Sequence, residues 1–250
     1  MKSNLRVFKD AEEMSRAAAE NFIAAAAQAI AERDRFIVAL NGGGTPRRLF
    51  QLLASAPDKM DWSRTHVFWG DERCVPPTDP ESSYGMAKEI LLDHVPIPLD
   101  NVHRVLSEPE PGEAVSDYIR VLKRFASPPL DWPRFDLILL GMGDDGHTAS
   151  LFPHSPVEAT APVLAVTGDY QSRPARRVTL TPLVFNSAQN VMFLVTGASK
   201  AGTLKHVLNQ ESPEQYPAAR IRPADGQVTW MVDEAAGSAL HSKSPGSKVS

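Results

Sequence analysis

The run Phe135-Asp136-Leu137-Ile138-Leu139-Leu140 is followed directly by Gly141-Met142-Gly143. A short, continuously apolar run that stops at glycines is typical of a strand buried on both faces of a parallel sheet. Similar runs recur along the chain, and they predict strands over residues 5–8, 36–40, 66–69, 135–140, 162–166, 178–181, 191–195 and 228–232.

Helical segments alternate with these strands. Asp10 and Glu13 form a capping-box pattern before an alanine-rich run, and Thr45-Pro46 is a second helix-start pattern. We predict helices over residues 11–32, 45–54, 82–93, 112–125 and 198–208. This alternation indicates one α/β domain, in which helices cover both faces of a mainly parallel sheet. We place the domain at residues 1–236 and expect the polar tail, residues 237–250, to be disordered.

Composition and charge disfavour several classes of protein. Of the 250 residues, 42% are hydrophobic and 22% are charged, which is ordinary for a globular domain. A net charge of -4 disfavours nucleic-acid binding, and no run approaches the ~20 apolar residues that span a bilayer. The single cysteine, Cys74, favours a reducing compartment. We expect a cytoplasmic protein without nucleic-acid or membrane partners, either a monomer or a weak homo-oligomer.

Four polar segments that contain or adjoin glycine each follow an apolar strand directly. They are residues 41–45, 70–73, 141–147 and 196–200. Because the carboxyl ends of parallel strands lie along one edge of a sheet, we expect these segments to converge in one crevice. Open α/β sheets bind their ligands at that edge.

The first of these segments contains Gly43, Gly44 and Thr45. Glycines allow a ligand to approach the backbone closely, and the following helix directs free N–H groups at an anion. A tight turn without a ligand is the competing interpretation. The segment matches neither the P-loop motif nor the dinucleotide-binding motif, so it favours a smaller phosphorylated ligand.

The next two segments carry charged groups. Arg73 can bind a carboxylate, phosphate or oxyanion through two hydrogen bonds, and Asp71 can orient a base or a hydroxyl. Asp145 lies two residues before His147, between glycines, which suits a general base oriented by a carboxylate. A solvated charged turn, and a structural histidine behind a capping aspartate, are the alternative interpretations.

Two further cations are candidates for binding a phosphate. Lys200 lies in the first turn of the last predicted helix, and Arg177 begins a predicted strand. Arg173 and Arg176 are close enough in sequence to compete with Arg177, and Lys200 has the alternative of being a solvated surface lysine.

The chain shows no pattern that demands another kind of active site. The spacing of His147 and His154 lacks an accompanying acidic ligand that would suggest zinc, and the nucleophile motif of many serine hydrolases is absent. Cys74 adjoins Arg73, which would favour a nucleophilic thiolate with a lowered pKa, but a bystander thiol is the favoured interpretation. We expect neither a metal nor an organic cofactor.

Seven segments together match those of a known family. They are Gly42-Gly43-Gly44-Thr45-Pro46, Phe68-Trp69-Gly70-Asp71-Glu72-Arg73, residues 141–153, Arg177-Val178-Thr179-Leu180-Thr181, Gly197-Ala198-Ser199-Lys200-Ala201, Pro217-Ala218-Ala219-Arg220-Ile221 and Trp230-Met231-Val232-Asp233. Through them the chain resembles the 6-phosphogluconolactonases of the oxidative pentose phosphate pathway, from about residue 5 to residue 236. Asn41 and Gly44 depart from the family pattern, which often has serines there.

The resemblance implies a Rossmann-like three-layer sandwich and the hydrolysis of 6-phospho-D-glucono-1,5-lactone to 6-phosphogluconate. We predict that His147 deprotonates the attacking water, with Asp145 and Asp71 setting its orientation. Arg73 stabilises charge in the tetrahedral intermediate or holds the substrate. The residues predicted to bind the phosphate are Gly43, Gly44, Thr45, Lys200 and Arg177.

Two other functions compete with this one. The related glucosamine-6-phosphate deaminases typically read Asp-Glu-Tyr where this chain has Asp71-Glu72-Arg73, and they carry a relay glutamate after the histidine, where this chain continues Thr148-Ala149-Ser150. Both differences favour the lactonase over a deaminase or isomerase. A non-catalytic sugar-phosphate sensor is the other alternative, although the chain leaves no room for a separate output module.

Overall fold

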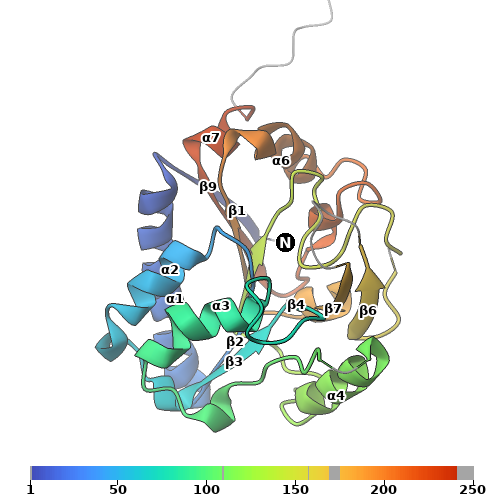
Figure 1. The fold of residues 1–250 in the computed structure, drawn as a ribbon. Coiled ribbons are helices and arrows are strands. Elements are labelled where there is room, and N and C mark those ends of the chain that lie inside the picture. Colours follow the sequence, from blue (N-terminus) through green and yellow to red (C-terminus); the bar gives the residue numbers. More distant parts are fainter. Residues whose placement is uncertain (1, 109, 157, 169–174, 241–250) are drawn as a thin grey trace, which may run out of the picture.

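Six parallel strands form the central sheet of the computed structural model, which describes residues 2–108, 110–156, 158–168 and 175–240 (Figure 1). Their order across the sheet is β1 (Lys2–Phe8), β9 (Gln227–Asp233), β8 (Asn190–Val195), β5 (Leu137–Gly141), β2 (Phe36–Leu40) and β3 (Thr65–Trp69). The predicted α/β class and parallel sheet are therefore confirmed.

The central strands are buried, as their continuous apolar sequences predict. Every residue of β2 is buried, and in β5 only Gly141 reaches intermediate exposure. The predicted strand over residues 135–140 begins two residues later in the structure. Asp136 lies just before it, where its carboxylate accepts a hydrogen bond from the N–H of Ile37 at 2.7 Å.

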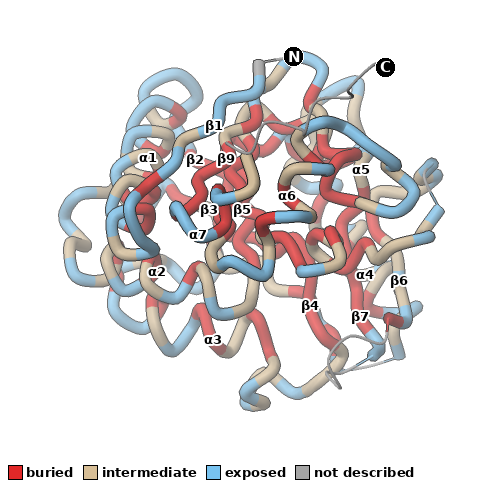
Figure 2. Tube along the Cα trace, turned by 90° about the horizontal axis from the view of Figure 1, so that it is seen from above, coloured by how far each residue is buried: buried red, intermediate tan, exposed pale blue. Residues whose placement is uncertain are grey.

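Helices cover both sides of this sheet. In Figure 2 the buried strands run between α1 (Ala11–Arg33) and α2 (Arg47–Ala54) on one side and α5 (Pro182–Phe185) and α6 (Ala201–Leu208) on the other. The remaining helices are α3 (Ser83–Ile90), α4 (Pro111–Lys123) and α7 (Glu234–Gly237). The predicted helices thus exist, with ends that differ by a few residues.

The two predicted helix starts differ in outcome. Asp10 caps α1, because its carboxylate accepts a hydrogen bond from the N–H of Glu13 at 2.9 Å. Thr45 does not cap α2, since Pro46 occupies the cap position and has no capping hydrogen bond. This moves Thr45 out of the helix and into the loop before it.

Two of the predicted strands lie outside the parallel sheet. The structure places β6 (Val163–Thr167) and β7 (Arg176–Leu180) in a separate antiparallel sheet with β4 (Asp71–Arg73), in the order β4-β7-β6. The segment at residues 70–73, which we expected to be a loop, is thus largely a strand. Gly70 joins the two sheets: its N–H donates to the carbonyl of Leu40, and its carbonyl accepts from the N–H of Leu180, both at 2.8 Å.

The topology creates one preferred place for a ligand. From β2 the chain continues to β3 on one side, whereas β5 on the other side continues to β8. Ligands of open α/β sheets bind at such a reversal of strand order, beyond the carboxyl ends of the two strands. Residues 41–45 and 141–147 therefore lie on either side of this point.

The described chain ends shortly after α7. The predicted boundary after residue 236 falls inside this helix, and Leu240 still packs against the core. Residues 241–250 of the predicted tail lie outside the described residues. Among the helices that the structure describes, none is both long enough and apolar enough to cross a membrane.

Candidate active site

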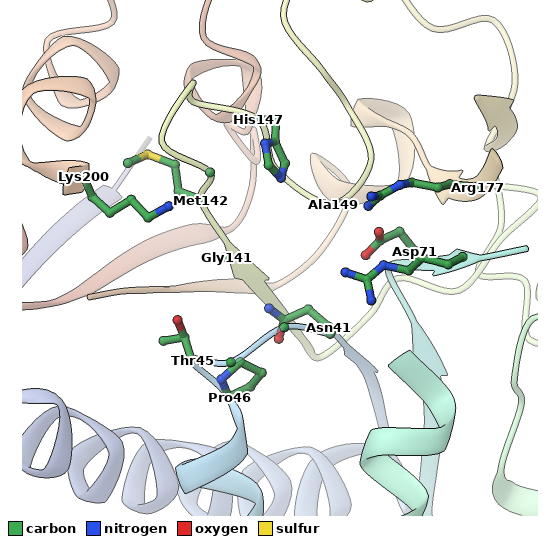
Figure 3. Close-up of a pocket in the computed structure, with 15 residues that line it drawn as sticks. Asn41, Thr45, Pro46, Asp71, Gly141, Met142, His147, Ala149, Arg177 and Lys200 are labelled. Carbon is green, nitrogen blue, oxygen red and sulfur yellow. The ribbon is translucent and has the colours of Figure 1, made fainter. Parts of the chain in front are cut away.

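A cavity of about 220 Å³ lies at the carboxyl ends of β2 and β5 (Figure 3). It is lined by Asn41, Gly42, Gly43, Gly44, Thr45, Pro46, Asp71, Arg73, Gly141, Met142, Gly143, His147, Ala149, Arg177 and Lys200. All the predicted site residues line it except Asp145, which is hydrogen-bonded to His147. The convergence expected from the sequence is therefore present.

Some of these lining residues had no role assigned from the sequence. They are Asn41, Gly42, Pro46, Gly141, Met142, Gly143 and Ala149. All of them belong to the motifs quoted above or adjoin them. Their position directly after a strand could therefore have indicated that they line the site. Ala149 also has a φ of 48°, an uncommon conformation for a residue with a side chain.

His147 and Asp145 form a hydrogen-bonded pair. The distance between Nδ1 of His147 and Oδ1 of Asp145 is 2.7 Å, and the same oxygen accepts the backbone N–H of His147 at 3.0 Å. Burial raises the pKa of the Asp145 carboxyl, but the hydrogen bonds from His147 outweigh it and hold that pKa below its ordinary value. The ionised carboxylate places the ring proton on Nδ1, so Nε2 carries the basic lone pair.

The loop that carries this pair is tightly closed. The N–H of Gly143 donates to the carbonyl of His147 at 2.8 Å, and the N–H of Gly146 donates to the carbonyl of Gly143 at 3.1 Å. A Cβ atom on Gly143 would lie 2.1 Å from Nδ1 of His147, closer than real contacts allow. Glycine is therefore required at 143 for the imidazole to hold its position.

The three residues of β4 face two different parts of the molecule. Successive strand residues face opposite sides, so Asp71 and Arg73 line the cavity and Glu72 does not. Oδ2 of Asp71 accepts a hydrogen bond from the hydroxyl of the buried Ser150 at 2.7 Å. The structure thus holds Asp71 through Ser150, a partner that the sequence analysis did not identify.

Glu72 instead anchors α3. Its carboxylate accepts backbone N–H groups of Ser83 and Tyr84, each at 2.7 Å, and the hydroxyl of Ser82 at 3.1 Å. Burial raises the pKa of this carboxyl, against the lowering effect of those N–H groups. The position is structural.

Arg73 and Arg177 are neighbours on adjacent strands of the small antiparallel sheet. They are direct partners in the β4–β7 register, and both are nearly buried, with 8% and 2% exposure. Arg73 donates to the carbonyl of Glu81, while Cζ of Arg177 lies 5.4 Å from the centre of the Phe152 ring. Like charges at opposed positions repel, and an anion between them would offset that repulsion.

Arg176, one of the two arginines that compete with Arg177, does not line this cavity. Arg176 is exposed, and its guanidinium lies 3.7 Å from a carboxylate oxygen of Glu110. Arg173 lies outside the described residues. Of the two arginines in this group that the structure describes, Arg177 lines the cavity and Arg176 does not.

Lys200 reaches the cavity from the opposite side. Figure 3 shows it with Thr45 on one side and Arg177 with Asp71 on the other, while His147 is directed into the space between them. Lys200 ends a short 3-10 turn and occupies the N-cap position of α6, so it lies just before the α-helix rather than within its first turn. Its ammonium lies 2.7 Å from Oδ1 of Asp144.

The glycine loop completes the cavity wall. Gly43 has a φ of 90°, which favours glycine. Asn41 is 5% exposed, and its Oδ1 accepts no hydrogen bond from any residue that the structure describes; Nε of the nearly buried Arg73 likewise has no acceptor there. Buried polar atoms of this kind require partners. A ligand with hydroxyl groups would supply them.

No metal centre is evident within the described residues, since they contain no cluster of three or more histidine, cysteine, aspartate or glutamate side chains suited to a metal. Cys74 is partly buried, and burial raises the pKa of its thiol. A raised pKa disfavours the nucleophilic thiolate.

Comparison with known proteins gives a consistent result. Residues 9–230 match the model of a family described as glucosamine-6-phosphate isomerases/6-phosphogluconolactonase. A 6-phosphogluconolactonase from Synechocystis is 42% identical over 216 residues, which cover 85% of this chain and 88% of that protein. One from Haemophilus influenzae is 41% identical over 207 residues, covering 80% and 85% of the two chains.

The fold agrees with these sequence matches. A crystal structure of 6-phosphogluconolactonase from Thermotoga maritima, 29% identical, superposes with a TM-score of 0.82 over 93% of this chain and 100% of that chain. The family model spans most of the sequence, and the sequence relatives exceed 40% identity over most of both chains. The chain therefore belongs to the 6-phosphogluconolactonase family, within the larger group that also contains the glucosamine-6-phosphate isomerases.

Proposed function

We propose that this chain hydrolyses 6-phospho-D-glucono-1,5-lactone to 6-phosphogluconate in the oxidative pentose phosphate pathway, with His147 as the general base. Family membership makes the chain a lactone hydrolase. The observation that carries the mechanism is the His147–Asp145 pair, whose imidazole is directed into a cavity flanked by three cationic side chains. Cys74 is the only cysteine, and the reducing cytoplasm is the compartment we propose for the reaction.

The attack begins at the lactone carbonyl. Nε2 of His147 takes a proton from a water molecule as the water oxygen bonds to C1. Asp145 holds the ring through Nδ1 and stabilises the imidazolium that forms. This places the charge of the tetrahedral intermediate on the former carbonyl oxygen.

Collapse of the intermediate opens the ring. The bond between C1 and the ring oxygen breaks, and His147 returns its proton to that oxygen, giving a hydroxyl and a carboxylic acid. Arg73 stabilises the oxyanion or holds the substrate near it, because a buried guanidinium is a strong donor to negative oxygen. Asp71, fixed by Ser150, orients the water or a sugar hydroxyl.

The phosphate lies against the backbone of Gly43, Gly44 and Thr45. Lys200 approaches it from the α6 side, and Arg177 approaches from the β7 side. A substrate anchored at this end presents its carbonyl to His147 in one orientation, which lowers the entropic part of the barrier. Asn41 and Arg73 then find hydrogen-bond partners among the sugar hydroxyls.

The residues after His147 argue against a deaminase. Thr148 has a structural role, because its hydroxyl donates a hydrogen bond to the carbonyl of Gly141 at 2.8 Å. The hydroxyl of Ser150 donates to the carboxylate of Asp71. No carboxylate occupies residues 148–153, where a deaminase relay would need one.

Two substrates separate the proposal from its alternatives. The purified chain is given freshly generated 6-phosphogluconolactone, with proton release followed at constant pH against a buffer blank, and separately glucosamine 6-phosphate, with ammonia measured. Proton release faster than the blank, without ammonia, supports the lactonase. Ammonia would establish the deaminase, and binding of sugar phosphates without turnover of either substrate would favour the sensor.

A further inference from the structure

Asp144 lies in the loop that carries His147, but its carboxylate contacts Lys200 and Ser199, which lie just before α6. Its Oδ1 lies 2.7 Å from the ammonium of Lys200. Lys200 lines the cavity, whereas Asp144 does not. The cation proposed to bind phosphate is therefore already paired with a carboxylate just outside the binding space.

This carboxylate is held in place independently of Lys200. The hydroxyl of Ser199 donates to the same Oδ1 at 2.8 Å, and the hydroxyl of Thr203 donates to the backbone carbonyl of Asp144 at 2.6 Å. The hydrogen bond from Lys200 is the main cause that holds the pKa of Asp144 below its ordinary value. If Lys200 turned toward a ligand, an ionised carboxylate would remain close to that ligand.

We propose that Asp144 competes with the substrate's phosphate for Lys200 and thereby limits how tightly the cavity holds phosphorylated ligands, above all the product. This inference rests on the proposed function, since it takes Lys200 as a partner of the phosphate. A phosphate dianion attracts the ammonium more strongly than one carboxylate does, so exchange is favourable. The remaining like charge of Asp144 reduces the gain.

The competition has a use in turnover. Substrate and product carry the same phosphate, and hydrolysis adds a carboxylate to the product. A site with unopposed cations would retain that product, and tight binding of product slows each cycle. Asp144 pairs again with Lys200 when the product leaves, so it promotes product release and has no part in the bond-breaking steps.

The direct test measures binding in the absence of turnover. Asp144→Asn keeps the size of the side chain and an oxygen for Ser199, but it removes the charge. Titration calorimetry with inorganic phosphate, and separately with 6-phosphogluconate, should give dissociation constants roughly fivefold lower than wild type. The difference should shrink as salt is added, because salt screens a partly exposed charge.

A matched control separates this local effect from the change in net charge. Asp93→Asn makes the same chemical change at a carboxylate paired with Lys88, in an exposed ion pair away from the cavity. It should leave both dissociation constants unchanged. Equal tightening in both variants would contradict the competition and assign the effect to long-range charge.

Lys200→Ala distinguishes failure of the inference from failure of the proposed function. This variant should weaken phosphate binding by about tenfold or more. If it does so while Asp144→Asn binds with unchanged or lower affinity, the competition is wrong and Asp144 instead holds Lys200 in place for the ligand. If Lys200→Ala binds phosphate as well as wild type, the phosphate assignment itself is wrong and the inference fails with it.

Discussion

The two sheets of this molecule contribute to the cavity in different ways. The parallel sheet contributes lining residues from the segments that follow its strands. These segments contain the glycine loop, His147 and Lys200. The antiparallel sheet contributes lining residues that belong to its strands: Asp71 and Arg73 of β4, which lie beside Arg177 of β7.

This difference separates two kinds of chemistry. The loops bring exposed backbone and a base whose position depends on close turns, whereas the strand residues are almost completely buried and fixed by their register. Lys200, at the end of its 3-10 turn, is paired with Asp144. Arg73, whose guanidinium lies 3.8 Å from a carboxylate oxygen of Glu81, is opposite Arg177 in the strand register. In the proposed mechanism the parallel edge supplies the base and part of the phosphate site, and the small sheet supplies two guanidinium groups that stabilise negative charge.

The largest expected effect is on the parallel side. His147→Ala should lower kcat by roughly 10²-fold or more, because it removes the general base. Initial rates of lactone loss, corrected for the blank, measure this effect. His94→Ala, at an exposed position whose ring nitrogen contacts the carbonyl of Glu89, is the control and should retain the wild-type rate. A kcat within twofold of wild type for His147→Ala would remove it from the mechanism.

Gly143→Ala tests whether the turn positions the base. The added Cβ would lie 2.1 Å from Nδ1 of His147, so the imidazole must move and kcat should fall by about tenfold or more. Gly112→Ala is the control, since a Cβ there meets nothing within 4 Å. Unfolding curves should show both variants folded. Equal kcat values for the two would show that the loop adapts without affecting catalysis.

The small sheet should affect binding as well as rate. Arg177→Ala should raise KM by about tenfold with a smaller change in kcat, whereas Arg73→Ala should lower kcat if it stabilises the oxyanion. Complete kinetics over a range of lactone concentrations separate the two. The reverse pattern would exchange the roles of the two arginines, and no change in either parameter would exclude the small sheet from the chemistry.

The smallest effect that we expect is one on stability: Asp145→Asn should change how the melting temperature depends on pH. Because the folded-state pKa of Asp145 is lowered, its stabilising contribution is complete above the ordinary aspartate pKa of about 3.9 and is lost as pH falls through the lowered value. The difference in melting temperature between wild type and variant should shrink as the pH falls below about pH 4. A difference that grows below about pH 4 would contradict this assignment.

The parallel half of the site was predictable from the sequence for a physical reason. Buried strands such as β2 and β5 are continuously apolar, and the polar segment after each must lie at the same edge. The position of His147 beside Asp145 follows from a spacing of two residues within one turn. Both features depend on residues that are close together in the sequence, so the sequence alone could predict them.

The antiparallel half depends on contacts between distant segments. β4 has three residues and pairs with a strand about a hundred positions later, so no local pattern separates it from a loop. The same limit applies to Glu72, which resembles Asp71 as a carboxylate but faces α3, and to Ser150, whose contact with Asp71 spans 79 positions. The pairing of Lys200 with Asp144 is likewise a contact between distant segments, which no local pattern indicates.

The measurement that tests this account most directly follows the loss of freshly generated 6-phosphogluconolactone in wild type, His147→Ala, Arg73→Ala and the double variant, beside a buffer blank. If base and guanidinium act on the same intermediate, wild type accelerates hydrolysis, each single variant loses most of that acceleration, and the double variant loses less than the product of the two single losses. Loss in the double variant equal to that product would mean that the two sheets act independently. A wild-type rate equal to the blank would contradict the lactonase assignment altogether.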